Sequence, residues 1–135
     1  MNDDVVYKLF PEPIFKYKLN NFENLNKELS KYIYKLRDED NEGLKKSNKG
    51  GWHSKPFRLE IEGSIQQTFA KEIQKNILDV FQKYGWKTKN VPITIQEMWA
   101  IINKNEDFNV LHSHPNCYLS AAYYVRAPKN CGKFE

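Results

Sequence analysis

The sequence predicts an α+β domain, with helices in its first half and β-strands in its second. Two stretches, 22–37 and 65–84, place apolar residues at steps of three and four, the period of one face of a helix. After Pro92 the pattern changes to β-branched and alternating residues in closely spaced segments. Strands that follow a helical half and pair in sequence are typical of an α+β domain or of the opening of a β-barrel.

Both predicted helices have recognisable ends. The first is expected to begin after Asn20 or Asn21, and the second after Ser64, since these side chains can accept hydrogen bonds from the first turn. Gly85 is the expected stop of the second helix. Residues 38–51, which are polar and rich in Gly, Asn and Lys, predict a loop. The apolar faces consist of Phe22, Leu25, Leu29, Tyr32, Ile33 and Leu36 in the first helix, and of Ile65, Phe69, Ile73, Ile77, Leu78 and Phe81 in the second.

Several segments outside the helices are expected to be extended. Residues 93–102 predict a strand buried on both faces or nearly so, and a polar turn at 103–107 separates it from 108–114. Residues 119–126 alternate, with Leu119, Ala121, Tyr123 and Val125 on one side. Two short extended pieces are expected in 5–19, broken by prolines, and a further strand is expected to begin at 133–135.

The composition indicates one ordered domain over residues 1–135. Hydrophobic residues make up 40% and aromatic residues 14%, enough to build a core and to exclude wholesale disorder. The sequence has no apolar run of the roughly 18 residues that a membrane span needs, and its start does not resemble a signal peptide. A cytoplasmic location is expected, or the host cytoplasm for a viral protein. Cys117 and Cys131 are expected to be free thiols without a functional role.

The formal charge of +4 raises the question of nucleic-acid binding. Of the 21 basic residues only Arg37, Arg58 and Arg126 are arginines, and arginine makes most of the bidentate contacts to bases and phosphates. The tight cluster of Lys45, Lys46 and Lys49 lies in the predicted loop. A mildly basic solvated surface is the favoured interpretation. A weak nucleic-acid binder is the alternative, and it predicts binding that falls steeply with salt.

His112 and His114 are the main candidates for chemistry. Residues i and i+2 of an extended chain lie on the same face, so both imidazoles can meet one metal ion. The pair predicts a metal site that needs further ligands. The alternative is that both are polar loop histidines beside Pro115.

Around this pair the sequence resembles the 2-oxoglutarate/Fe(II) oxygenases of bacteria and their viruses, a group related to the prolyl-hydroxylase-like enzymes. The resemblance covers roughly residues 47–135. A loop similar to the group's "SN-x-GGW-x-S" comes first, and a strand similar to "LSG-x-YY-x" follows the histidines, with Ala121 where glycine is usual. A start similar to "G-x-[IL]-x-F" closes the chain. The matching stretches are, in order, Ser47–Ser54, Trp99–Asn103, Asp107–Asn109, His112–Pro115, Leu119–Val125 and Gly132–Glu135.

The resemblance implies a fold, two ligands and a cosubstrate. The fold would be two N-terminal helices packed on an incomplete double-stranded β-helix (jelly-roll or cupin-like) of mostly antiparallel strands. Fe(II) would be bound first by His112, with His114 at the position where a carboxylate is usual, and 2-oxoglutarate would be the cosubstrate. The family's distal histidine and basic residue have no counterpart after His114. We therefore expect a chain truncated at its C-terminal side or a shortened relative, and self-association through an open sheet edge.

Other side chains are weaker candidates. Trp52 and Trp99 either line a substrate pocket or belong to the core, and Arg126 either binds a carboxylate or is an exposed strand end. His53 and Asp107 are conceivable third ligands, with ordinary packing and turn roles as the alternatives. Further pocket candidates are Gln96, Ser120 and Tyr124; which of Tyr123 and Tyr124 points inward is open.

Three functions compete at this point. The first is a 2-oxoglutarate- and Fe(II)-dependent dioxygenase, a hydroxylase, incomplete or inactive as this chain. The second is a structural or binding protein that keeps the scaffold without the reaction, and the third is the basic nucleic-acid binder. For the dioxygenase, small molecules and protein side chains are both open as substrates.

Overall fold

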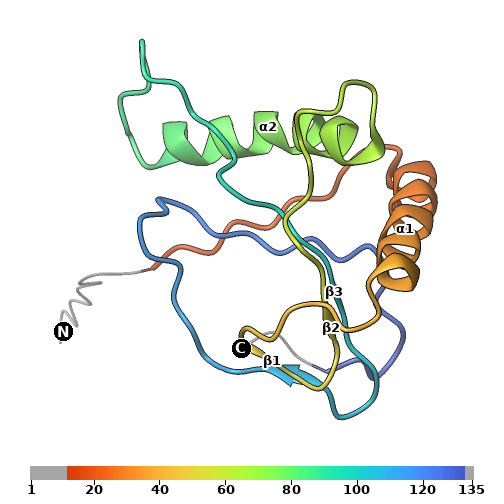
Figure 1. The fold of residues 1–135 in the computed structure, drawn as a ribbon. Coiled ribbons are helices and arrows are strands. Elements are labelled where there is room, and N and C mark those ends of the chain that lie inside the picture. Colours follow the sequence, from red (N-terminus) through yellow and green to blue (C-terminus); the bar gives the residue numbers. More distant parts are fainter. Residues whose placement is uncertain (1–11, 133–135) are drawn as a thin grey trace, which may run out of the picture.

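Two helices and two very small antiparallel sheets form the regular structure (Figure 1). The structure is a computed structural model that describes residues 12–132. Helix α1 spans Phe22–Glu39 and helix α2 spans Ile65–Lys83, and the two pack against each other. Strand β1 (Asn48–Lys49) pairs with β4 (Phe108–Asn109), and β2 (Trp52–His53) pairs with β3 (Ile101–Ile102). Of the two extended pieces predicted in 5–19, residues 12–19 form no strand, and residues 5–11 lie outside the described residues, as does the strand predicted at 133–135.

Both ends of helix α2 lie where the sequence predicts them, and each has an identifiable cause. At its start the Ser64 hydroxyl accepts a hydrogen bond from the amide of Gln67 at 3.3 Å. At its end Gly85 has a φ of 70°, and its amide donates to the Gln82 carbonyl. The next amide, of Trp86, donates to the Phe81 carbonyl, which completes a Schellman turn. The α2 prediction is therefore confirmed to within one residue at its C-terminal end.

Helix α1 begins at Phe22 as expected, but it is not capped as expected. Asn21 occupies the N-cap position with a φ of 53°, and its side chain makes no capping hydrogen bond. Asparagine is one of the few residues that adopt this left-handed conformation without large strain. The role of Asn21 is thus to reverse the chain before the helix.

The core lies where α1, α2 and two extended segments meet. Leu19, Leu29 and Phe69 are buried at its centre. In Figure 1 the blue segment that contains Tyr123 and Val125 crosses the molecule beside the red segment before α1, and both side chains pack on this core. The Tyr123 ring lies 4.8 Å from that of Phe69, and its hydroxyl donates to Asn26 Oδ1 at 2.6 Å. Partly buried residues around the core are Phe22, Leu25, Ile33, Ile65, Ile73 and Met98.

The predicted strands are only partly confirmed. Within 93–102 only Ile101 and Ile102 form a strand, and residues 94, 96 and 97 are exposed, so burial on both faces is wrong. Segment 119–126 forms no strand, although Leu119, Tyr123 and Val125 are its more buried positions, as the alternation predicts. Residues 12–132 show no evident jelly-roll. Alternation fixes which side chains face a core, but a ladder also needs a second backbone in register, and these segments have none within the described chain.

The β2–β3 pairing, which directly follows the predicted loop, is the one that further hydrogen bonds extend. Trp52 lies opposite Ile102 and His53 opposite Ile101. Beyond β2 the two segments stay bonded, because the Ser54 amide donates to the Ala100 carbonyl at 2.9 Å and the Phe57 amide to the Met98 carbonyl at 2.7 Å. The β2–β3 ribbon thus extends from residue 52 to 57 as an irregular antiparallel pair.

Gly43 lies against this ribbon, in a conformation and a space that suit only glycine. Its replacement should therefore lower the free energy of unfolding. It has a φ of 59°, and a Cβ there would lie 2.5 Å from the His53 carbonyl oxygen and 2.7 Å from the Trp52 ring. Gly43→Ala adds overpacking, typically about 1–3 kcal/mol, to left-handed strain of about 1–2 kcal/mol. Gly63→Ala is the matched control, because its φ of 69° brings the same strain but no atom lies within 4 Å of its Cβ. Urea denaturation of both variants should show the larger loss for Gly43→Ala, and equal losses would contradict this packing.

Asp40, three residues before Gly43, forms an ion pair with Lys55, and this pair should make the stability of the protein depend on pH. Asp40 lies 2.8 Å from the Lys55 ammonium, which lowers the pKa of Asp40 below 3.8, helped by the Gly43 amide. A depressed carboxyl pKa adds stability above the unfolded value and loses it as the pH falls through the folded value. Below pH 3.8 we expect the midpoint temperature of unfolding to fall less steeply with decreasing pH in the Lys55→Gln variant than in the wild type. Identical acid limbs would show that the pair does not contribute.

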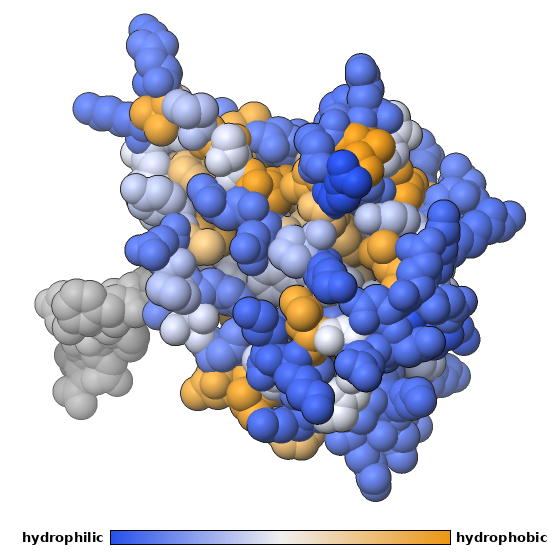
Figure 2. All heavy atoms as spheres, viewed as in Figure 1, coloured by the Kyte–Doolittle hydropathy of each residue, from blue (hydrophilic) through white to orange (hydrophobic). Residues whose placement is uncertain are grey.

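The face shown in Figure 2 is mostly hydrophilic, with apolar groups between the charged side chains. One such group, at the lower left of Figure 2, lies over β4 and the chain that follows it in Figure 1. In this part of the chain Phe108 and Val110 are exposed and Leu111 is fully exposed. Within residues 12–132, neither helix has the length and apolar character that crossing a bilayer requires.

Candidate metal centre

The structure brings His112 and His114 into contact. Their ring centroids are 4.8 Å apart and the rings are inclined at 74°. Both residues follow β4 without being part of a regular strand. His112 is exposed and His114 is half-buried, so solvent and small ligands can reach the pair.

This spacing fits two imidazoles on one ion. A metal such as Zn²⁺ lies about 2.0–2.1 Å from a histidine nitrogen, and the ring centre lies about 1.1 Å beyond that nitrogen. Two such rings at an angle between about 90° and about 109° at the metal have centres roughly 4.5–5.1 Å apart. The observed 4.8 Å lies within that range. The distance between the ring centres is therefore compatible with two imidazoles on one ion.

The hydrogen bond of His112 fixes which nitrogen is free. Its Nδ1 lies 2.8 Å from the Val110 carbonyl oxygen. A carbonyl only accepts, so Nδ1 bears the hydrogen and the neutral ring presents the lone pair of Nε2. Metal-binding histidines usually donate their second N–H in this way, which fixes the tautomer and the ring. The lone pair of the neutral His112 ring is thus on Nε2.

The β1–β4 pair positions Val110 and through it His112. Asn48 lies opposite Asn109, and one residue further on the Val110 amide donates to the Ser47 carbonyl at 2.9 Å. The Asn48 side chain stabilises the same turn by accepting from the Lys46 amide at 2.8 Å. The loop expected from the family resemblance therefore fixes the position of the backbone just before His112.

Trp99 connects the histidine pair to the third histidine of the chain. Its ring lies 5.6 Å from that of His114, at 36°, and 5.6 Å from that of His53, with which it is nearly parallel at 12°. Each ring contacts the next, in the order His112, His114, Trp99 and His53. Trp99 is half-buried and packs between the rings of His114 and His53.

Ser54 is the residue that places Trp99, and sequence reasoning gave it no role. It is 1% exposed, its amide donates to the Ala100 carbonyl, and its hydroxyl accepts from the Ala100 amide at 2.9 Å. Ala100, the residue directly after Trp99, is thus held by Ser54 through both its amide and its carbonyl. The signal was present, since Ser54 is the final serine of the "SN-x-GGW-x-S" pattern.

Neither proposed third ligand joins the pair. Within residues 12–132 no three His, Cys, Asp or Glu side chains are grouped so that they could hold a metal ion. His53 contacts Trp99 instead. Asp107 serves as a turn residue, because it accepts the Lys104 amide at 2.7 Å and lies where a Cβ on Gly50 would be. Among the described residues, the histidine pair thus has no third side chain of these types grouped with it.

The other pocket candidates lie apart from the pair. Trp52 and His53 are consecutive in β2, so their side chains point to opposite faces of the ribbon, and His53 is on the Trp99 side. The Trp52 indole is buried and donates to the Asp40 carbonyl at 2.7 Å. Tyr123 is the inward tyrosine, and Tyr124 is 58% exposed. The remaining candidates, all exposed, are Gln96, Ser120 and Arg126.

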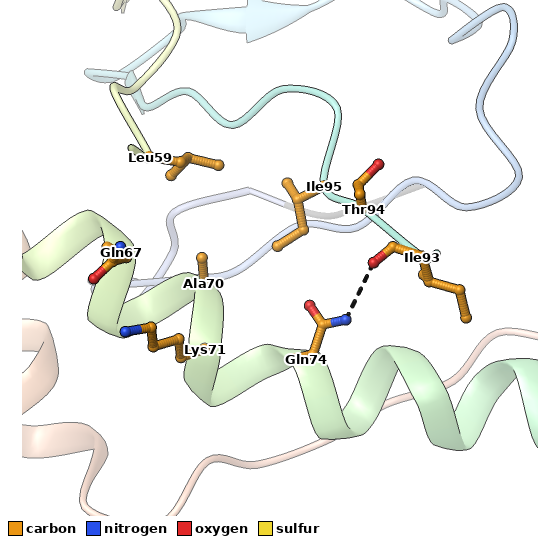
Figure 3. Close-up of a pocket in the computed structure, with 8 residues that line it drawn as sticks. All are labelled: Leu59, Gln67, Ala70, Lys71, Gln74, Ile93, Thr94 and Ile95. Carbon is orange, nitrogen blue, oxygen red and sulfur yellow. Dashed lines mark hydrogen bonds between the residues drawn. The ribbon is translucent and has the colours of Figure 1, made fainter. Parts of the chain in front are cut away.

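Two hollows of the described surface lie away from the histidine pair. One, of about 440 Å³, lies between α2 and the chain before Trp99 (Figure 3). There Leu59, Ala70 and Ile95 come together, and the Gln74 amide donates to the Ile93 carbonyl at 3.4 Å. This bond ties segment 93–95 to α2 and so anchors the chain that leads to Trp99. The other hollow contacts Trp52 on the opposite face of the ribbon.

The comparison with protein families agrees with this part of the chain. Residues 97–135 match the family described as "Putative 2OG-Fe(II) oxygenase". The matched segment includes Trp99 and both histidines of the pair, and the predicted resemblance is confirmed there. The match is partial, because it leaves α1, α2 and the 47–54 loop outside. No curated protein and no solved structure matches the chain.

Proposed function

We propose that this chain is an oxygenase-like domain that binds Fe(II) through His112 and His114 and takes 2-oxoglutarate as cosubstrate. The observation that carries the proposal is the ring geometry of the pair, with His112 held in the tautomer that frees Nε2. The family match supports it, because the matched segment contains both ligands. The ring geometry and the family match thus concern the same part of the chain, residues 97–114.

The residues present would do three things for such a site. His112 and His114 would each supply one nitrogen ligand, and both are accessible enough to leave positions for the cosubstrate. Trp99 would form an apolar wall beside His114 and restrict water on that side. Bound iron would supply the redox chemistry by which O2 and 2-oxoglutarate hydroxylate a substrate. A small molecule or a protein side chain is the proposed substrate class.

The missing ligand belongs to the proposal. The described residues contain two ligands, so a further one would come from outside residues 12–132 or from a second copy. Segment 119–126 has the alternation of a strand and no strand partner among those residues. We propose that it is part of an incomplete double-stranded β-helix whose open edge pairs with further strands.

Succinate release tests this function. The purified chain with Fe(II), 2-oxoglutarate and O2 is expected to release succinate above a metal-free control, and chelation should abolish it. Metal binding at the pair without succinate would support a non-catalytic scaffold. No binding of Fe(II) or of 2-oxoglutarate, together with no succinate, would contradict the proposal.

A further inference from the structure

We propose that His53 and Trp99 are positioning residues that hold the imidazole of His114 beside that of His112. The inference rests on the proposed metal function but concerns residues that do not bind the metal. It starts from a difference between the two ligands. His112 is oriented by its bond to the Val110 carbonyl, whereas in the described chain no hydrogen bond is formed by the His114 ring. The aromatic rings beside that of His114 in the described chain are those of His112 and Trp99.

His53 is itself immobilised. It is 6% exposed, and its Nδ1 lies 2.7 Å from the Ser54 carbonyl oxygen, so that this nitrogen donates. Its backbone is fixed as well, because it pairs with Ile101 and its carbonyl accepts from the Leu44 amide at 2.8 Å. A side chain held by burial, a ladder and a hydrogen bond is a rigid support.

His53 transmits this rigidity to Trp99. The two rings are nearly parallel, at 12° and 5.6 Å, so the imidazole limits rotation of the indole in that direction. The backbone directly after Trp99 is fixed by two hydrogen bonds, because the Ser54 amide donates to the Ala100 carbonyl and the Ala100 amide donates to the Ser54 hydroxyl. The position of the indole is therefore set at its backbone and at its ring.

Trp99 in turn limits His114. The two rings are 5.6 Å apart and tilted at 36°, and His114 is half-buried. If the indole becomes mobile, the His114 ring gains rotamers in which its nitrogen no longer converges with that of His112. A ligand that must first be ordered binds a metal more weakly, because its side-chain entropy is lost on binding. Outer partners of metal ligands commonly change affinity by about 10–100-fold.

The experiment compares His53→Ala with His53→Phe, which keeps a flat ring at the same place. Tyr84→Ala is the matched control, because it removes the ring stacked at 4.6 Å on Trp86, a tryptophan at the end of α2. Without metal, histidine-selective NMR should show the His114 ring resonances of His53→Ala moving toward random-coil values, since the ring current of Trp99 is lost. His53→Phe and Tyr84→Ala should leave them close to wild type. Thermal unfolding of each variant establishes that it is folded.

The same variants are then titrated with Ni(II) by calorimetry. We expect the Kd to rise about tenfold in His53→Ala and to stay within about twofold in His53→Phe and Tyr84→Ala. Trp99→Leu leaves His53 in place and should repeat the loss, which keeps the test valid if His53→Ala does not fold. Wild-type binding with unchanged His114 resonances and an unchanged Kd in both variants would overturn the inference and leave the proposed function intact. A wild type that does not bind Ni(II) at the pair would overturn both, the proposed function first.

Discussion

His112→Ala is expected to weaken Co(II) binding by about a hundredfold or more. In the proposed site the ring is one of two ligands, and it is the one whose tautomer is fixed by the Val110 carbonyl. Loss of a direct ligand should exceed the roughly 10–100-fold effect of losing an outer partner. Calorimetry or the visible absorption of bound Co(II) measures the change, and Asn116→Ala, an exposed neighbour in sequence, is the control.

A double-mutant cycle tells whether the two rings act on one ion. If they do, His114→Ala should cost little further affinity once His112 is already replaced, so the effects will be far from additive. Two independent surface histidines would instead give equal, separate and additive losses. Additivity within about twofold would therefore contradict a shared site.

Leu29→Ala is expected to lower the free energy of unfolding by about 3–5 kcal/mol. Leu29 is 2% exposed and lies in the cluster with Leu19 and Phe69, where both helices and the segment of Tyr123 meet. A domain of this size has about 5–15 kcal/mol in total, so the variant should be partly unfolded at moderate urea concentrations.

The control for this variant uses the same chemical change at an exposed helical position. Leu78 in α2 is 39% exposed, so Leu78→Ala removes the same atoms from a site that is already partly solvated. Urea titration followed by circular dichroism should give a much smaller loss for Leu78→Ala, with similar slopes for both. Equal losses would show that Leu29 is not at the centre of the core.

Local patterns predicted the helices well because their determinants are local. The spacing of the apolar positions, the hydroxyl of Ser64 and the left-handed position of Gly85 lie within or next to α2, and each has the predicted role. The same holds for the orientation of segment 119–126, where alternation predicted that Leu119, Tyr123 and Val125 share a side. The wrong expectation for Asn21 is also local: its backbone, and not its side chain, prepares the start of α1.

Pairing between distant segments could not be predicted in this way. The opposition of His53 and Ile101 is accompanied by the close approach of Gly43 to the His53 carbonyl and by two hydrogen bonds between Ser54 and Ala100, and neither feature has a periodic signature. Of the two roles expected for Trp52, burial is the one found, and β2 places its side chain on the face opposite to that of His53. The i, i+2 spacing suggested that His112 and His114 can meet, and the structure brings their rings together without a regular strand at that point.

The most direct test of the central claim is zinc titration of protein labelled with 15N in its histidines. Zn²⁺ prefers imidazole nitrogen and is diamagnetic, so each ring nitrogen can be followed during binding. We predict that the Nε2 signal of His112 and one ring-nitrogen signal of His114 shift together with a single affinity, while Nδ1 of His112 stays protonated and His53 keeps both of its signals. Separate affinities for the two rings, a shift in one of them alone, or coordination of His53 in place of His114 would contradict the account.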